Sequence, residues 1–188
     1  AFTRSAINPA DAQNIRNSES QFMVKGNFSV SGKEKEVMCA FQVGMKKVMR
    51  EDNQDYLKFS DHVGKYPVVL ITPQDIELIW GGAELRRKFF DTLLSQIDNN
   101  YLESLITYTH HLKQRNSVLR KFAETGITDY TLLESYDHKI ASAGTYIHNR
   151  RKTLLQQFVP LFKTHYSFIA QESAERVDIQ YRSDLDKG

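Results

Sequence analysis

The sequence has no long apolar run, and this excludes a membrane-spanning helix. Its apolar runs, such as the four-residue stretch 68–71, are far shorter than the roughly 20 residues that a spanning helix needs. No charged-then-apolar leader opens the chain. Cysteine is almost absent too: Cys39 alone can form neither an internal disulfide nor a thiolate metal site, and we expect it to fill the core. These absences predict a cytoplasmic protein without membrane contact.

Proline and glycine are scarce, and this argues against disorder. The 188 residues include four prolines and nine glycines, with 40% hydrophobic and 26% charged residues, as in a globular domain or a domain with one large appendage. The 25 Lys and Arg exceed the 23 Asp and Glu by only two charges, so nucleic-acid binding must depend on where the cations lie. Because the chain starts at Ala1 without a methionine, we expect a segment excised from a longer protein.

The first region, 1–72, has the pattern of β-strands. Apolar residues nearly alternate over 22–30, 37–43 and 46–50, with Gly32 and Gly44 between these stretches, which predicts an antiparallel meander. Together with the helices that follow, this predicts an α+β fold.

Two further elements are expected in this region. Asn8, Pro9 and Asp11 form the usual start of a helix, which we place over 9–17. The stretch 66–71 is continuously apolar and β-branched, which indicates a strand buried on both faces of a larger sheet.

The second region, 73–173, is predicted to be helical because apolar residues recur every three or four positions. A proline-containing start at Thr72 and the glycine pair at 81–82 delimit a short first helix. Three longer helices are expected over 83–97, 99–123 and 131–158.

Capping residues place the ends of these helices. Asp98 is expected to cap the helix over 99–123, and Gly126 to end it. Thr131 and Glu134 have the spacing of a capping box, and Pro160 should kink or restart the last helix.

Two apolar stripes with seven-residue spacing flank Gly126 and predict an antiparallel, coiled-coil-like hairpin. They consist of Leu105, Leu112 and Leu119, then Leu133, Ile140, Ile147 and Leu154. The same spacing fits the core of a small bundle, and periodicity alone does not decide between bundle and arm. The last region, 174–188, alternates apolar and polar residues over 176–181, like one strand returning to a sheet.

Motifs for catalysis or metal binding are missing. The sequence contains no Gly-x-Ser-x-Gly elbow, no Gly-x-x-x-x-Gly-Lys-Ser/Thr loop and no His-Glu-x-x-His helix. The six histidines have no carboxylate or cysteine at ligand spacing, so we predict no metal site. An independent small enzyme is therefore the weakest of three hypotheses.

Cations cluster on the predicted helices. The stretches 110–121 and 138–152 each carry four Lys or Arg and no acid, while the turn between the helices is acidic, and two further arginines lie at 86–87. Such a surface can bind phosphates with little sequence preference. The same residues also fit solvated helix faces, on which cations in the last turn interact favourably with the helix dipole. Arg87 could simply form an ion pair with Asp91, one turn away on the same helix.

Several stretches resemble the RecF family of DNA replication and repair proteins. The stretch 67–79 reads PVVLITPQDIELI and is followed by Gly82 and, over 86–91, by RRKFFD. The sequences AQNIR at 12–16 and KQRNSVL at 113–119 match further segments of that family. Its helical segments are also matched by Tyr101, Leu105, Tyr108, Leu112, Asp137, Ala141, Gly144, Ile147 and Arg150.

The resemblance implies a fold and a function. RecF proteins are similar to the ATPase heads of SMC proteins: an ABC-type lobe with a helical arm that dimerises around ATP. Region 1–72 would then be part of the ATPase lobe, 73–173 the arm and 174–188 a strand returning towards the head. The intact protein would be a weak DNA-dependent ATPase using ATP and Mg, and would act with RecO and RecR at gapped DNA to help load RecA.

The ATPase motifs themselves are not in this sequence. By the resemblance, a P-loop would precede Ala1, and the signature and Walker B motifs would follow Gly188, so we expect no cofactor on this chain alone. Gln74 occupies the place of the Q-loop, which senses the nucleotide's metal in ABC-type heads. It could equally be a first-turn helix residue without a ligand.

Two hypotheses for the function of the helical arm are favoured. In the first, the arm contacts the DNA backbone, gapped or duplex, through a set of basic residues. These are Arg86, Arg87, Lys113, Arg115, Arg120, Lys121, Arg150 and Arg151. In the second, the arm docks RecR or a second copy of itself without touching DNA. Its contacts would be aromatic: Tyr101, Tyr108, Tyr130 and Tyr136.

Overall fold

The computed structural model describes residues 3, 5, 8, 10–171 and 177–186. The chain divides into two compact units, Ala1–Ile71 and Thr72–Gly188. Over the described residues, no helix combines the length and apolarity needed to cross a membrane.

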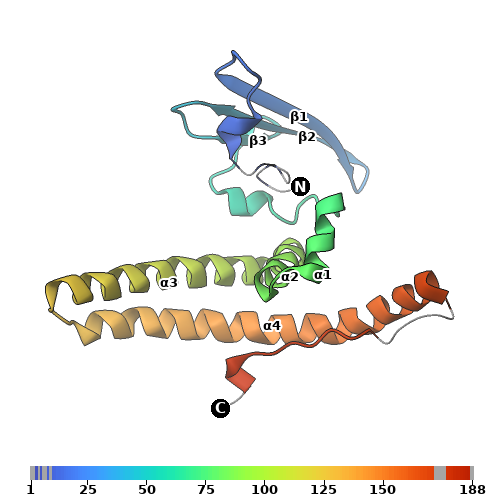
Figure 1. Cartoon of the computed structure of the whole chain (residues 1–188). Coiled ribbons are helices and arrows are strands. Elements are labelled where there is room, and N and C mark those ends of the chain that lie inside the picture. Colours follow the sequence, from blue (N-terminus) through green and yellow to red (C-terminus); the bar gives the residue numbers. More distant parts are fainter. Residues whose placement is uncertain (1–2, 4, 6–7, 9, 172–176, 187–188) are drawn as a thin grey trace. The chain divides into compact units, whose positions relative to one another are not determined.

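The first unit is built on a four-stranded antiparallel sheet, which confirms the predicted meander (Figure 1). Strands β1 (Gln21–Val30) and β2 (Lys33–Gln42) pair along their whole length. Strand β3 (Val48–Glu51) pairs with β2, and the very short β4 (Gln54–Asp55), which the sequence pattern did not predict, closes the order β1-β2-β3-β4.

The core of this unit lies around β2 and β3. Val37 and Met49 are buried together with Tyr66, which comes from the segment after the sheet. Phe28, Cys39 and Tyr56 pack against them. Cys39 is therefore core filler, as expected, and burial raises the pKa of its thiol.

The strand predicted over 66–71 is wrong. After the buried Tyr66 this stretch is irregular, and the side chains of Val69 and Ile71 are 79% and 84% exposed. A strand buried on both faces needs hydrogen-bonded neighbours on its edges. Among the described residues, the sheet ends at β1 and β4, and neither pairs with this stretch.

The helix predicted over 9–17 is reduced to one 3-10 turn, η1 (Asp11–Asn14), and Pro9 lies outside the described residues. A short helix needs an apolar face to bury, and this segment carries only one large apolar residue, Ile15, which is already extended. The turn is attached to the sheet unit by an ion pair of 2.7 Å between Asp11 and Lys47.

The second unit is helical, as predicted. The 3-10 turn η3 (Pro73–Ile76) leads into the short α1 (Glu77–Trp80), which ends at Gly81. Helices α2 (Ala83–Ile97) and α3 (Asn99–Thr125) follow, and α4 (Tyr130–Ala170) returns alongside α3 as an antiparallel hairpin (Figure 1).

The hairpin packs around one buried cluster at the end where α2 joins it. Leu94 of α2, Tyr101 of α3 and Ile147 of α4 are each at most 5% exposed. Leu105, Tyr108, Tyr146 and Leu154 pack against this cluster. Farther along α3, Leu119 of the predicted stripe is 37% exposed. The stripe therefore forms a two-helix arm anchored at one end, not the core of a bundle.

Most helix ends lie where the capping residues place them. The Asp98 carboxylate accepts a hydrogen bond of 3.0 Å from the Tyr101 backbone N–H, and Gly126 ends α3 in the left-handed region at φ 71°. The capping box at Thr131 is wrong. Instead, Asp129 caps α4 by accepting a bond of 3.0 Å from the Leu132 N–H, because it lies directly before the first helical residue.

Pro160 neither restarts nor ends α4, which continues to Ala170. The proline removes one backbone N–H from the helix, but apolar residues on both sides keep the helical periodicity. Phe158, Phe162 and Tyr166 form consecutive aromatic contacts of 6.1 Å between ring centroids along this stretch. These side-chain contacts along the helix therefore outweigh the local cost of the proline.

The strand predicted over 176–181 is also wrong where the structure describes it. Arg176 lies outside the described residues, and 177–183 is irregular before the 3-10 turn η5 (Asp184–Asp186). The segment lies along α4, where Asp178 pairs with Lys163 at 2.8 Å and Asp186 with Lys152 at 3.1 Å. Side-chain ion pairs with a helix thus replace the expected backbone pairing with a sheet.

Candidate nucleic-acid interface on the hairpin

The eight basic candidate residues divide into two groups. Four make hydrogen bonds or ion pairs within the second unit: Arg86, Arg115, Arg150 and Arg151. No such bond within the described residues involves the other four, which are exposed: Arg87, Lys113, Arg120 and Lys121. The second group can contact a ligand without giving up a bond within the unit.

Within the first group, Arg151 makes three hydrogen bonds to residues of other helices. Its Nε lies 2.9 Å from Oδ1 of Asp91, its Nη2 lies 2.8 Å from Oδ2, and Nε also lies 3.0 Å from the Tyr101 hydroxyl. The Tyr101 hydroxyl in turn donates to Asp91 at 2.6 Å. The predicted Arg87–Asp91 pair is therefore wrong, because Asp91 of α2 is bound across the unit by α4.

Arg150 forms a second ion pair between α4 and the start of α3. Its Nε donates to the Asp98 carboxylate at 2.6 Å, and the Tyr146 hydroxyl lies 3.2 Å from the same oxygen. Burial alone would raise the pKa of Asp98, but the hydrogen bonds from the Tyr101 backbone N–H and from Arg150 lower it overall. Asp98 thus both caps α3 and ties it to α4.

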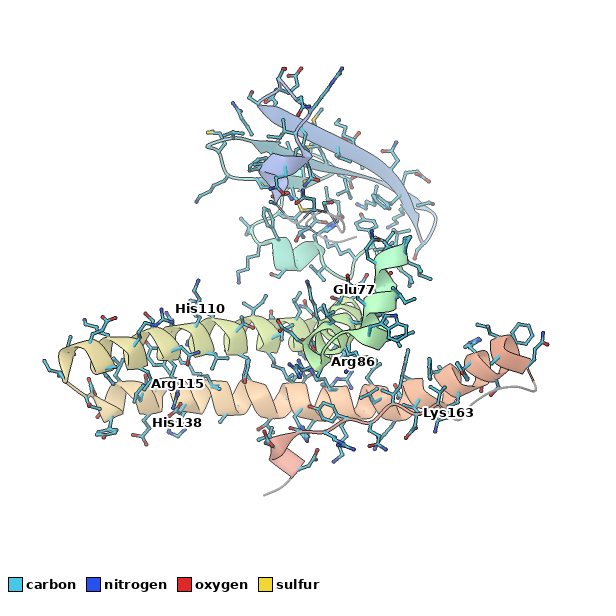
Figure 2. The ribbon with its side chains drawn as sticks, in the orientation of Figure 1. Glu77, Arg86, His110, Arg115, His138 and Lys163 are labelled. Carbon is cyan, nitrogen blue, oxygen red and sulfur yellow. The ribbon has the colours of Figure 1, made fainter. Side chains whose placement is uncertain are left out.

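Arg86 and Arg115 have structural partners as well. Arg86 donates to the backbone carbonyls of Leu78 and Gly81, at 3.0 and 2.8 Å, and so satisfies the last turn of α1. Arg115 crosses the hairpin to Asp137, with its Nε 2.5 Å from Oδ1. Figure 2 shows Arg115 on the side of α3 that faces α4.

The cations of α3 that make no hydrogen bond or ion pair within the described residues lie on one side of the helix. Lys113 lies seven positions before Arg120 and eight before Lys121, so the three side chains project within an arc of about 100° on one side of the helix. Figure 2 shows His110, one turn before Lys113, on the side away from α4. No acid occurs between Glu103 and Glu124. We call Lys113, Arg120 and Lys121 the cationic face. It can bind a row of phosphates with little sequence preference.

A groove between α3 and α4 is a weaker candidate for phosphate. It is lined by Glu103 and Thr107 of α3 and by His138 and Lys139 of α4. The Glu103 carboxylate offsets the Lys139 charge, so an anion gains little there.

Gln74 lies exposed in the 3-10 turn η3. Its neighbours Thr72 and Asp75 are engaged in capping that turn, with the Asp75 carboxylate 2.6 Å from the Thr72 N–H. A nucleotide triphosphate needs a cradle of backbone N–H groups with a lysine and a hydroxyl, and the sequence of this chain offers no such motif. The residues of this chain therefore do not fit an ATP phosphate site by themselves.

The aromatic hypothesis loses most of its residues. Tyr101 is fully buried, and Tyr108 packs against the hairpin core. Tyr136 is partly buried, whereas Tyr130 is 78% exposed. Of the four tyrosines predicted to face a partner, only Tyr130 has the exposure that this role needs.

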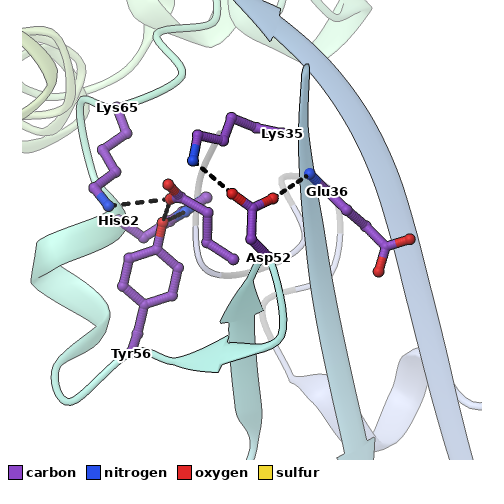
Figure 3. Close-up of polar contacts among 7 residues, drawn as sticks. Lys35, Glu36, Asp52, Tyr56, His62 and Lys65 are labelled. Atoms are coloured by element: carbon purple, nitrogen blue, oxygen red, sulfur yellow. Dashed lines mark hydrogen bonds and ion pairs between the residues drawn. The ribbon is translucent and has the colours of Figure 1, made fainter. Parts of the chain in front are cut away.

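Sequence reasoning missed a polar cluster in the first unit (Figure 3). Glu51 accepts hydrogen bonds from the Tyr56 hydroxyl and, at 3.0 Å, from Lys65. Next to it, Asp52 binds Lys35 at 2.5 Å and accepts from the Glu36 backbone N–H at 3.0 Å. No motif signals this cluster, because its members come from β2, the end of β3, the β3–β4 turn and the segment after the sheet.

Each group of this cluster is satisfied by another, which indicates a structural role. The hydrogen bond from Tyr56 lowers the pKa of Glu51, and burial together with Glu51 raises the pKa of Tyr56. His62, 1% exposed and 3.3 Å from the Tyr56 hydroxyl, has its pKa lowered by burial to about 4 and is neutral at pH 7. Over the described residues, no three His, Cys, Asp or Glu side chains gather as a metal site would require.

Comparisons with known proteins identify close relatives. The DNA replication and repair protein RecF of Flavobacterium johnsoniae is 37% identical over 185 residues, which cover 98% of this chain and 51% of that protein. The RecF protein of Cytophaga hutchinsonii is 36% identical over 184 residues, covering 98% and 48%. The chain thus spans about half the length of the curated relatives it matches. No family model matches the chain.

Solved structures agree with these relatives. A structure of the recombination mediator protein RecF with ATP, in the RecFOR pathway, superposes with a TM-score of 0.81 at 29% identity and covers 90% of this chain and 45% of that chain. A second RecF structure of the same pathway, with ATPrS, has the same TM-score and identity and covers 92% and 46%.

Proposed function

Because this chain belongs to the RecF family over the half of its relatives' length that it spans, we propose that it acts in DNA repair and recombination as the helical arm and part of the head of such a protein. The arm contributes contacts to the DNA backbone. The RecF relatives and the fold they share support this proposal, and the cationic face of α3 supports the DNA contact.

The cationic face carries the argument for DNA because it has no structural task. Lys113, Arg120 and Lys121 make no side-chain hydrogen bond or ion pair within the described part of the chain, and the nearest acid in sequence is Glu124, one helical turn after Arg120 and Lys121. Like charges on one helix face repel each other, so a phosphate row that binds them removes an unfavourable interaction as well as forming ion pairs. To bind phosphate, Arg150 and Arg151 would instead have to break their ion pairs with Asp98 and Asp91.

The remaining functions are proposals for the whole protein. The RecF structures with ATP and ATPrS support ATP binding, with Mg and ATP-dependent dimerisation as the family expectation, and this chain's own residues supply no phosphate cradle for it. The RecFOR pathway named for those structures supports RecO and RecR as partners at gapped DNA. A protein acting on the chromosome in this way would work in the cytoplasm.

A fluorescence-anisotropy titration tests the DNA contact directly. The chain is titrated with labelled gapped and fully duplex DNA at about 50 and 200 mM salt, where the release of counterions is visible. Steeply salt-dependent binding supports the proposal. If the chain is folded by circular dichroism and does not bind either DNA at the lower salt, the cationic face is not a DNA-binding surface of this chain.

A further inference from the structure

The turn of the hairpin exposes apolar side chains that its fold does not use. We call residues 122–136, which join α3 to α4, the hairpin tip. Ile127, Tyr130 and Leu132 are 72%, 78% and 38% exposed and lie within six positions of one another. Single exposed apolar residues are ordinary, but three together on one turn form a patch of the kind that marks an interaction site.

The backbone of the hairpin tip is held in place by its own hydrogen bonds. The Thr125 hydroxyl donates to the Lys121 carbonyl at 2.9 Å and accepts from the Ile127 N–H at 3.3 Å. Gly126 ends α3 in the left-handed region, and Asp129 caps α4. The apolar side chains therefore project from an ordered turn, and a partner that binds them does not have to order a loop first.

The charges of the hairpin tip indicate what kind of partner it fits. Glu124, Asp129 and Glu134 are exposed, and no Lys or Arg occurs from 122 to 136. An acidic surface repels the phosphates of nucleic acids and of anionic lipids. It favours a protein surface of the opposite charge, since complementary rims steer association and apolar centres supply most of the affinity.

We propose that the hairpin tip docks a protein partner by inserting Ile127 and Tyr130 into an apolar pocket bordered by Lys and Arg. The site differs from the cationic face in both position and charge. One arm would therefore bind DNA along α3 and a protein at its end. The inference rests on the proposed function only for its probes, which are the pathway partners RecO and RecR.

Binding of the chain to purified RecO and RecR tests the proposal by biolayer interferometry. Ile127→Asp should weaken the affinity for one of them at least tenfold, because a carboxylate enters the apolar pocket. Ile106→Asp is the matched control: Ile106 is 51% exposed on the same hairpin, and the same change there should alter the affinity less than twofold. Glu124→Lys with Glu134→Lys should also weaken binding, whereas Asp129 is left intact because it caps α4.

Several outcomes would overturn the proposal. They are no binding of either protein, equal effects of the two Ile variants, or a dimer of the chain that Ile127→Asp dissociates, which would make a second copy the occupant. Circular dichroism checks that every variant is folded. The DNA titration is also run on Ile127→Asp, which leaves the cationic face intact, and it should be unchanged. A chain that binds a partner at the hairpin tip but not DNA would therefore refute the proposed DNA contact alone.

Discussion

Arg151 of α4 binds Asp91 of α2 across sixty positions of sequence, and both atoms of the carboxylate take part. Each side chain is 17% exposed, and the buried Tyr101 hydroxyl lies against the pair. Burial works against the charged form of Arg151, but the charges and hydrogen bonds of Tyr101 and Asp91 raise its pKa overall. The pair fixes α2 on the hairpin at the end where the arm begins.

Removing this arginine should destabilise the helical unit. Arg151→Leu leaves the Asp91 carboxylate poorly solvated without its partner, and we expect the free energy of unfolding to fall by about 3 kcal/mol. Urea denaturation followed by far-UV circular dichroism measures the change. The control is Arg87→Leu, on the exposed side of α2, which should change stability by less than about 0.5 kcal/mol. Equal losses in the two variants would contradict the assignment of Asp91 to Arg151.

Reversing the cationic face should weaken DNA binding and flatten its salt dependence. Each phosphate contact contributes about 0.9 to the slope of log affinity against log salt, so Lys113→Glu, Arg120→Glu and Lys121→Glu together should reduce the slope by up to about 3. The matched control reverses three exposed lysines of the first unit: Lys33, Lys46 and Lys58. A control variant that loses as much slope as the test variant would show that net charge, not the face, attracts the DNA.

His62 should make the first unit sensitive to mild acid. Its pKa is about 4 in the folded protein against 6.5 for an ordinary histidine, so the unfolded chain takes up a proton first as the pH falls. Stability is full above pH 6.5 and should decline by up to about 3 kcal/mol towards pH 4. The pKa of Glu51 is lowered, so the stability it contributes is lost below its usual range and adds little in this window.

The variant His62→Phe keeps an aromatic ring beside Tyr56 and Tyr66 and removes the titrating group. Denaturant midpoints measured between pH 4 and 7 should then become nearly flat for this unit. His165→Phe, at an exposed position of α4, should leave the pH profile unchanged. A profile that keeps its slope without His62 would refute the buried neutral histidine.

Pro160 should be a source of local instability in α4. Pro160→Ala restores the backbone N–H that can bond to the Gln156 carbonyl and removes the clash of the ring, so we expect a gain of up to about 3 kcal/mol. Thermal unfolding of the second unit measures it. Gln157→Ala, at a neighbouring exposed position, is expected to change little. A loss of stability in Pro160→Ala would mean that the proline supports the packing of the helix.

Local signals predicted most of the helical unit. Asp98 and Gly126 act within a few residues of their own backbone, so their roles in starting and ending α3 are visible in the sequence. The predictions that failed concern segments whose structure depends on pairing with a distant part of the chain. The stretch 66–71 has every property of a buried strand, but a strand exists only if another strand pairs with it.

The sequence by itself determined the α+β character of this protein, the meander, the hairpin and the family, because alternation, helical periodicity, caps and family motifs are properties of neighbouring residues. Only the tertiary structure decided which cations are free. Arg150 and Arg151 differ in no visible way from Arg120 and Lys121 in the sequence. Their partners Asp98 and Asp91 lie 52 and 60 positions away, and an ion pair depends on distance in space, which no local pattern records.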